Sequence, residues 1–339
     1  SNLWYRLMNI LITGGAGYIG SHTARALLEQ GHKVCVFDNL SRGHKEAVQR
    51  TVGLEQLTIA SLHDTDRLTQ VLLSEGIELV IHLAAFALVG ESQTRPEMYF
   101  RNNVLGSQSL LSAMNQANVH KLIVSSTTAV YGTPRQMPIT ESFERAPVNQ
   151  YGRTKLEMEL SLEHAVSQSD LAVVALRYFN AAGAHPNGDL GEDHHPETHL
   201  IPITLQVALG QREQLEIFGD DYATPDGTCV RDYVHVCDLA SAHICAMDVL
   251  SSGKVQYFNI GTGAGTSVSE VLDACRKVSG HPIPSVAGIR RSGDPDILYA
   301  DNSKAVSELK WSPKYTSIEQ IVETAWKWHS ESPSGYRSG

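Results

Sequence analysis

A glycine-rich turn between a predicted strand and a predicted helix is the feature that most constrains the fold. Residues 9–14 read NILITG, an apolar run typical of a buried strand, and residues 20–31 read GSHTARALLEQG, a helical pattern that ends at a glycine. The turn that joins them, GGAGYIG, spaces Gly14, Gly17 and Gly20 three residues apart. Glycines in this context permit a tight turn, a close approach of the backbone to a pyrophosphate and close helix–strand packing. The turn therefore predicts a dinucleotide site, with the phosphates at the amino terminus of the helix.

The first half of the chain alternates apolar strands with amphipathic helices. Further strands are expected at 33–38, 79–85 and 121–126, and helices at 65–76 and 94–118. Strands that are apolar throughout and separated by helical patterns imply a parallel sheet covered on both faces. We therefore predict an α/β fold, a doubly wound parallel sheet of the Rossmann type.

An acid at the end of the second strand indicates which dinucleotide is bound. Asp38 ends the strand 33–38. A carboxylate there accepts hydrogen bonds from the adenosine ribose and repels a 2′-phosphate, which favours NAD over NADP. Arg42 acts against this preference, but the carboxylate is expected to dominate. The alternative, an ordinary turn acid in DNLSRG, is disfavoured by the glycine turn.

The composition of the 339 residues excludes several classes of protein. A formal net charge of −10 argues against general nucleic-acid binding. No apolar run reaches the ~18–20 residues that cross a bilayer, and the start, SNLWYRL, lacks the apolar stretch of a signal peptide. The five cysteines contain no CxxC pair and indicate reduced thiols in a cytoplasmic protein. Met8 opens the first strand directly, which makes residues 1–7 an extension in this interpretation.

A tyrosine and a lysine four residues apart form the first candidate for catalysis. In NQYGRTKLEMEL (149–160), Tyr151 and Lys155 share one face of a predicted helix. This spacing alone is also typical of ordinary helix surfaces. Together with the GxxGxxG turn, however, a Tyr-x-x-x-Lys near residue 150 resembles the short-chain dehydrogenase/reductase superfamily in its extended form.

That resemblance implies a role for each residue in a hydroxyl–carbonyl interconversion. Tyr151 is the general acid/base, although a free phenol has a pKa near ~10. Lys155 and the positive nicotinamide ring would stabilise the phenolate and lower that pKa, and Lys155 would also hold the nicotinamide ribose. In VSSTTAVYG (124–132), Thr127 would hydrogen-bond the reacting oxygen, with Ser125 nearer the cofactor.

Three segments of the second half resemble one family more specifically. They are RYFNAAGAHPNGDLGEDHHPETHLIP (177–202), IFGDDYATPDGTCVRDYVHVCDLA (217–240) and IRRSGDPDILYAD (289–301), and they are similar to the UDP-glucose (UDP-galactose) 4-epimerase family. The resemblance implies reversible C4 epimerisation of UDP-galactose and UDP-glucose through a 4-keto sugar, with the hydride held transiently on tightly bound NAD. No metal is needed, and most binding energy should lie in the UDP anchor, remote from the reacting carbon.

The resemblance also implies contacts residue by residue. Two arginines would pair with the diphosphate, a task suited to guanidinium groups. The contacts expected for NAD are Gly14, Gly17, Tyr18, Ile19, Gly20, Asp38, Asn39, Ser61, Leu62, Leu83, Ala84, Ala85, Asn102, Ser125, Tyr151, Lys155 and Tyr178. The contacts expected for the UDP-sugar are Thr127, Tyr151, Asn180, His199, Leu200, Ile217, Phe218, Arg231, Arg291, Asp294 and Leu298.

Three positions depart from the best-known form of the family. Ser61 stands where an acid often receives the adenine amino group, which puts the retention of NAD in question. Ala87 stands where some members carry a lysine over the cofactor. Leu298 occupies the position that sets room for a 2-acetamido group, where tyrosine restricts the pocket and cysteine or serine opens it. We favour the plain hexose, and leave an N-acetylhexosamine, pentose or uronate of UDP as the alternative substrate.

Three rival functions are weighed against this one. A nucleotide-sugar 4,6-dehydratase would need an acid pair after Thr127, where this chain has Thr128 and Ala129. A non-catalytic NAD-sensing regulator would be expected to lose Tyr151 or Lys155. A metal site in GEDHHPETHL is disfavoured because Pro196 interrupts any helix there, and no metal is predicted.

The expected organisation has two domains with an interleaved boundary. The NAD-binding domain is placed at 8–178, and a smaller α/β UDP-sugar-binding domain at 179–335. The polar tail after Trp328 is expected to fray. The resemblance further implies a homodimer formed through helices near 94–118 and 151–167.

Overall fold

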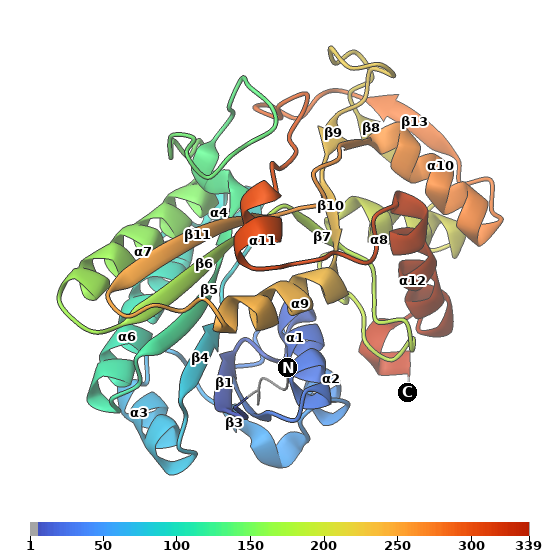
Figure 1. Cartoon of the computed structure of the whole chain (residues 1–339). Helices are drawn as coiled ribbons and strands as arrows, with labels where there is room; N and C mark the ends of the chain where they lie inside the picture. The colour runs from blue at the N-terminus through green and yellow to red at the C-terminus, as the bar shows by residue number, and fades with distance from the viewer. Residues whose placement is uncertain (1–5, 339) are drawn as a thin grey trace. The chain divides into compact units, whose positions relative to one another are not determined.

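The computed structural model describes residues 6–338 (Figure 1). These residues form two compact units. Unit 1 consists of the chain up to Gly132, Arg145–Arg177 and Ala240–Phe258, and unit 2 of Thr133–Glu144, Tyr178–Leu239 and the chain from Asn259. Residues 1–5 of the expected extension lie outside the described residues, as does Gly339. The assignment of NAD to 8–178 and of the UDP-sugar to 179–335 stays a prediction.

Unit 1 is built around a seven-stranded sheet in the order β3-β2-β1-β4-β5-β6-β11. Strand β1 pairs in parallel with β2 and β4, and parallel pairing continues from β2 to β3 and from β4 to β5. The elements wholly or mainly in unit 1 are β1 Asn9–Thr13, α1 Tyr18–Glu29, β2 Lys33–Asp38, α2 Lys45–Gln49, η1 Leu54–Gln56, β3 Leu57–Ile59, α3 Thr65–Ser74, β4 Leu79–His82, α4 Val89–Thr94, α5 Pro96–Tyr99, η2 Phe100–Leu105, α6 Gly106–Gln116, β5 Lys121–Thr127, η3 Thr128–Tyr131, α7 Gln150–Ser167, β6 Ala172–Tyr178, α9 Val236–Met247 and β11 Lys254–Ile260.

Alternate strand residues face opposite sides of this sheet, as the strand period requires. Cys35 and Phe37 of β2 join the large core that α3, α6 and α7 cover. Val36, between them, packs instead with Ala16 and Val48 on the other face. Both faces are therefore covered, and the predicted doubly wound parallel sheet of the Rossmann type is confirmed.

Unit 2 has a second core, formed where α8, α10 and α12 pack together (Figure 1). Its strands form three two-stranded sheets: β7 with β10, β9 with β12, and β8 with β13. The remaining elements of unit 2 are β7 Asn180–Ala182, α8 Leu200–Ala208, β8 Leu215–Phe218, β9 Val230–Arg231, β10 Tyr233–His235, β12 Thr266–Ser267, α10 Val268–Ser279, β13 Ser285–Gly288, α11 Ser303–Glu308, α12 Ile318–Glu331 and η4 Gly335–Ser338.

Two local predictions differ from the structure. The single helix expected at 94–118 begins at Pro96, because proline suits the first helical position, and it contains a π-helical segment, η2. The tail expected to fray is ordered: Tyr336 is buried, and its ring packs 4.9 Å from that of Trp328, centroid to centroid. An aromatic side chain near the end of a polar segment supplied the apolar area that fixes it.

The five cysteines are free thiols, and Cys35, Cys229 and Cys275 are buried. Among the described residues, no helix is both long and apolar enough to cross a membrane.

Candidate functional site

The glycine turn packs tightly enough in unit 1 to exclude side chains at two positions. Gly14 has a φ of +77°, and a Cβ there would lie 2.7 Å from the backbone nitrogen of Ala84. A Cβ on Gly20 would lie 2.2 Å from the carbonyl oxygen of Gly14. The turn therefore sits against the chain that leaves β4, and helix α1 starts directly over it.

The amino terminus of α1 suits an anion. Its N-cap residue is Gly17, no side chain caps the first turn, and no acidic residue lies there. Helix α7, by contrast, is capped by the side chain of Asn149, which accepts from the backbone N–H of Gly152 at 2.8 Å. The uncapped amino terminus of α1 and the glycine cradle fit the pyrophosphate of a dinucleotide.

Asp38 lies beside this turn at the end of β2. Its carboxylate accepts from the backbone N–H groups of Ala16, at 3.1 Å, and Leu40, at 2.8 Å. Burial raises the pKa of Asp38, and these two hydrogen bonds act against the rise. Arg42 is paired with Glu91 at 2.5 Å, and its guanidinium carbon lies 4.7 Å from the centroid of the Phe86 ring. The cation that would favour NADP is thus already paired.

The predicted catalytic residues come together in unit 1. The Lys155 ammonium donates to the carbonyl oxygen of Ser125 at 2.9 Å and to its hydroxyl at 3.2 Å. The Tyr151 phenol is close enough to Thr127 for that side chain to act on its pKa, and the Thr127 hydroxyl accepts from the backbone N–H of Ala129 at 3.2 Å. The carboxyl end of β5 and the first turns of α7 therefore build one cluster.

Burial shifts the pKa values of the two titratable groups in this cluster. It raises the pKa of Tyr151 to about 12, and the hydrogen bond with Thr127 acts against that rise. It lowers the pKa of Lys155 to about 8, and the charge of Glu159 acts against that fall. Without ligands at pH 7, the pair is therefore a neutral phenol and, predominantly, an ammonium.

Other residues predicted to contact the cofactor have varied surroundings. Leu62 is buried, and its carbonyl oxygen accepts from Ser109 at 2.5 Å. Ser61 is exposed, and its hydroxyl accepts from the backbone N–H of His63 at 3.2 Å. Asn102 donates to Asn103 at 2.9 Å within η2. Tyr178 is buried and belongs to unit 2.

Four residues predicted to hold UDP cluster in unit 2. The Arg291 guanidinium donates to Asp294 at 2.9 Å and lies 5.1 Å from the centroid of the Phe218 ring. Arg231 lies 4.0 Å from the same carboxylate. Two segments about 60 residues apart in sequence therefore meet in this cluster. Two arginines, a carboxylate and an aromatic ring are a set of groups suited to binding a nucleoside diphosphate.

The chain around this cluster is fixed by main-chain bonds. Leu298 is half-buried, and its N–H donates to the carbonyl oxygen of Val230, next to Arg231, at 3.0 Å. The N–H of Asn180 donates to the carbonyl oxygen of Asp232 at 2.9 Å. Ile217 and Phe218 pair in parallel with β13. His199 is the N-cap of α8, where Leu200 is the first residue.

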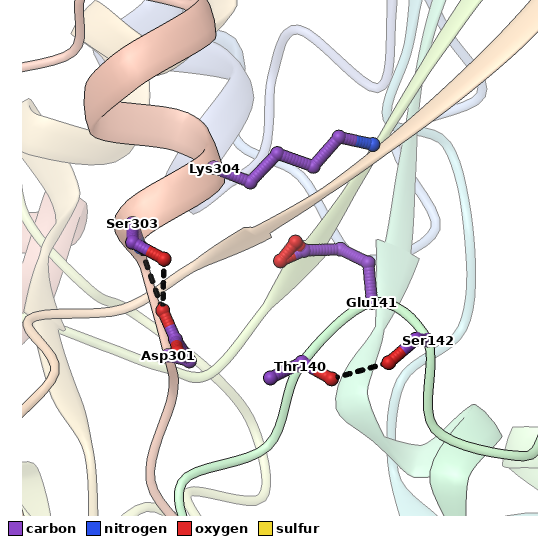
Figure 2. Close-up of a pocket in the computed structure, with 6 residues that line it drawn as sticks. All are labelled: Thr140, Glu141, Ser142, Asp301, Ser303 and Lys304. Carbon is purple, nitrogen blue, oxygen red and sulfur yellow. Dashed lines mark hydrogen bonds between the residues drawn. The ribbon is translucent and has the colours of Figure 1, made fainter.

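A separate pocket of about 440 Å³ in unit 2 contains none of the predicted site residues (Figure 2). It is lined by Thr140, Glu141, Ser142, Asp301, Ser303 and Lys304. The Thr140 and Ser142 hydroxyls bond each other at 2.7 Å, and Asp301 accepts from the N–H of Ser303 at 2.9 Å. Because these polar groups satisfy one another, the clusters above are the stronger candidates for the chemistry.

Comparison with known proteins decides the family. The model of the NAD dependent epimerase/dehydratase family matches residues 10–261, about three quarters of the chain. The chain belongs to the NAD dependent epimerase/dehydratase family. The predictions of an enzyme and of an NAD cofactor are thereby confirmed.

Relatives of this family member are similar over nearly their whole length. The UDP-glucose 4-epimerase of Halalkalibacterium halodurans is 52% identical over 330 residues, 97% of this chain and 98% of the relative. A crystal structure of a UDP-glucose 4-epimerase superposes with a TM-score of 0.92 at 47% identity, covering 97% of this chain and 99% of the other. The Bifidobacterium longum UDP-glucose 4-epimerase, solved with NAD⁺ and UDP, gives a TM-score of 0.90 at 39% identity, covering 96% and 99%.

In this member of the epimerase/dehydratase family, sequence reasoning missed a buried polar chain that starts below the glycine turn. The Nδ1 of His82 lies 2.6 Å from the Thr13 hydroxyl, and its Nε2 lies 3.0 Å from the Ser107 hydroxyl. Ser107 donates to the carbonyl oxygen of Asn103 at 2.7 Å, so Nε2 carries the proton and donates to Ser107. The side chain of Asn103 continues to Thr154 on α7, at 3.2 Å. The sequence signal for this buried polar chain was the position of His82 between the apolar residues of a predicted strand.

A buried ion-pair network anchors α7 to the sheet. Glu159, fully buried one turn after Lys155, accepts from Arg177 through both oxygens, at 2.8 and 2.7 Å. It also accepts from Ser126 at 2.7 Å. The network fixes α7 against β5 and β6, the strands that carry Ser126 and Arg177, and so fixes the helix of Tyr151 and Lys155.

Proposed function

We propose that the chain catalyses the reversible C4 epimerisation of UDP-galactose and UDP-glucose through a 4-keto sugar. The observation that carries the proposal is one buried cluster, in which the Tyr151 phenol lies near Thr127 and the Lys155 ammonium is held by Ser125. The relatives named UDP-glucose 4-epimerase, at up to 52% identity, support the substrate.

The side chains supply the proton transfers of this reaction. When bound, NAD⁺ supplies a reversible acceptor for the hydride from C4. Tyr151 takes the proton from the sugar 4-hydroxyl as the carbonyl forms, and it returns the proton when the alcohol re-forms. The Lys155 cation favours the phenolate form, and the Thr127 hydroxyl donates to the reacting oxygen. Protons and electrons balance over the cycle, because each is returned.

The cluster of arginines in unit 2 supports a role as the UDP anchor. Arg231 and Arg291 already share Asp294, and the diphosphate would replace that carboxylate as their partner while Asp294 turns to the ribose hydroxyls. Phe218 offers a face for the nucleotide. Binding energy placed there leaves the sugar free to turn between the two hydride transfers.

The alternative substrates are other UDP-sugars, namely an N-acetylhexosamine, a pentose or a uronate. They would use the same anchor, and the discriminating residue is Leu298. Its backbone is fixed by Val230, so the volume of its side chain decides the room beside the sugar's second carbon.

Product analysis with separate substrates tests the proposal. Purified protein is incubated with UDP-galactose or with UDP-N-acetylgalactosamine, after bound NAD has been quantified to test whether Ser61 weakens retention. Conversion of UDP-galactose is expected. A folded, NAD-loaded protein that leaves UDP-galactose unchanged would refute the proposal, and conversion of the acetamido sugar would show that Leu298 admits it.

We also propose a homodimer formed through η2, α6 and α7. Phe100, Leu105 and Leu160 expose large apolar side chains on these helices, and η2 packs on α7 within unit 1. Sedimentation should give a dimer for the unmodified chain and a monomer for Leu105→Glu, with Leu73→Glu, an exposed leucine on α3, as the control. A monomer in the unmodified chain would exclude the dimer. The cytoplasmic location stays a prediction from cysteine usage.

A further inference from the structure

Four metal-ligating side chains converge in the loop that precedes α8. They are Glu192, His194, Glu197 and His199, and one potential ligand atom of each lies within 4.8 Å of all the others. All four belong to unit 2. None takes part in the chemistry proposed above, although His199 is among the predicted substrate contacts.

Three nitrogen–oxygen distances within this group are close to the spacing of neighbouring ligands on one ion, two of them through different oxygens of Glu197. The Nδ1 of His194 lies 3.2 Å from Glu192 Oε1 and 3.6 Å from Glu197 Oε2. The Nδ1 of His199 lies 3.6 Å from Glu197 Oε1 and in closer contact with Glu192 Oε1. Nitrogen and oxygen ligands bind zinc at ~2.0–2.1 Å, which separates tetrahedral neighbours by about 3.4 Å.

The charges and burial of the group also suit a divalent cation. The Glu192 and Glu197 side chains are only 3% and 5% exposed, whereas those of His194 and His199 are 31% and 49% exposed. Two carboxylates with two neutral imidazoles carry a charge of −2, which a divalent ion neutralises. Metal-bound imidazoles of this kind leave their other nitrogen to solvent or to a second partner.

The loop is held in place around the cluster. The Trp328 indole donates to the carbonyl oxygen of Glu192 at 3.0 Å, and Glu197 Oε1 accepts from the N–H groups of Thr198 and His199, each at 2.9 Å. The imidazole rings of His194 and His199 lie edge to face with centroids 5.4 Å apart. The ligands are therefore oriented by neighbouring groups, as second-shell contacts orient the ligands of known metal sites.

We propose that Glu192, His194, Glu197 and His199 form a four-coordinate site for a divalent transition metal, with zinc as the first candidate, which braces the loop before α8. A closed site with four protein ligands is structural rather than catalytic. Zinc accepts this mixed oxygen and nitrogen set without a geometric preference of its own. The proposal departs from the prediction of no metal. That prediction considered a metal site only on a helix, which Pro196 interrupts, whereas the loop brings the four side chains together without a helix.

Zinc binding to the full-length protein tests the site. After chelator treatment and dialysis, ZnCl₂ is titrated against a competing zinc indicator, and bound metal is counted by mass spectrometry. We expect one zinc per chain, and at least a tenfold loss of affinity in His194→Gln and Glu197→Gln. His195→Gln is the matched control, because His195 lies in the same loop but pairs with Asp193, at 3.0 Å.

Two further measurements separate a built site from surface binding. Zinc should raise the melting temperature of the unmodified protein and of His195→Gln but not that of His194→Gln, because only binding to the folded state stabilises it. Co²⁺ should give the intense visible absorption of four-coordinate cobalt. Equal zinc affinity in the unmodified protein and His194→Gln would overturn the proposal. A loss of zinc affinity in His195→Gln as large as that in His194→Gln would also overturn it. Circular dichroism establishes that each variant is folded.

Discussion

Burial is one physical cause that shifts the pKa values of Tyr151 and Lys155 in opposite directions. Burial disfavours charge, so it raises the pKa of the phenol and lowers that of the ammonium. The ligand-free Tyr151 is thus a proton donor, and in the proposed mechanism its ionised form depends on the Lys155 cation and on Thr127. Above about pH 8 Lys155 loses its charge, and with it the stabilisation of the phenolate.

Replacing Tyr151 by Phe should reduce turnover while leaving substrate binding intact. The hydroxyl carries the proton transfer, and losing a general acid/base typically costs about 10²–10⁴-fold in rate. The ring is retained, and the hydrogen bond from the backbone N–H of residue 151 to the Ser92 hydroxyl, at 3.0 Å, does not depend on the side chain. Steady-state kinetics with UDP-galactose and UDP titration measure the two effects. Turnover within a few-fold of normal would remove Tyr151 from the mechanism.

His82 should make the protein less stable as the pH falls below about 6.5. Burial, and then the charge of Lys155, lowers the pKa of His82 to about 3, whereas the unfolded chain binds this proton near 6.5. Between these values the unfolded state holds one more proton, so the free energy of unfolding falls by about 1.4 kcal/mol per pH unit from this group.

The variant His82→Gln isolates that contribution, because it lacks the titrating ring. Urea denaturation at pH 7, 6 and 5 should show the stability advantage of the unmodified protein shrinking as the pH falls. A difference between the two proteins that does not change with pH would contradict a neutral, buried His82. The part of the stability difference that is the same at every pH comes from the lost hydrogen bonds of His82 to Thr13 and Ser107.

At the scale of elements, α7 is the part of the site that depends most on packing. Its N-cap Asn149 and the Tyr-x-x-x-Lys spacing are local features, and they could be predicted from the sequence. Its anchorage could not, because Glu159 and Arg177 are partners only through the fold. The hydrogen-bonded side chains that link His82 to Asn103 could not be predicted either. The π-helical segment η2 could not be predicted because a 3.6-residue periodicity does not distinguish it from an α-helix.

Glu159→Gln should destabilise unit 1 strongly. The change leaves the buried Arg177 guanidinium without its carboxylate, and breaking such a pair costs about 3–5 kcal/mol. Glu163→Gln on the same helix is the control: its side chain is 38% exposed and pairs with Arg145, so we expect about 1 kcal/mol or less. Denaturant unfolding measures both. Equal effects would show that burial of the pair does not determine the anchorage of α7.

At the scale of the whole molecule, the chain crosses repeatedly between its two units. Local patterns predicted the sheet of unit 1 because each βα step is short and apolar. The segment 133–144 belongs to unit 2 and the segment 240–258 belongs to unit 1. Those segments are assigned by tertiary packing. The ordered tail at Tyr336 has the same origin, because its partner Trp328 is fixed by the loop at Glu192.

Hydrogen exchange should assign one ligand to each unit. NAD is expected to protect amides at 14–20, 38–39 and 83–85, where the glycine turn and Asp38 lie. UDP added to the NAD-loaded protein is expected to protect 215–218 and 289–298 because it replaces the contacts among Phe218, Arg291 and Asp294 by tighter ones. Helices α3 and α11 carry no predicted contact and should exchange unchanged. Protection by UDP confined to unit 1 would contradict the anchor, since the arginines that carry it lie in unit 2.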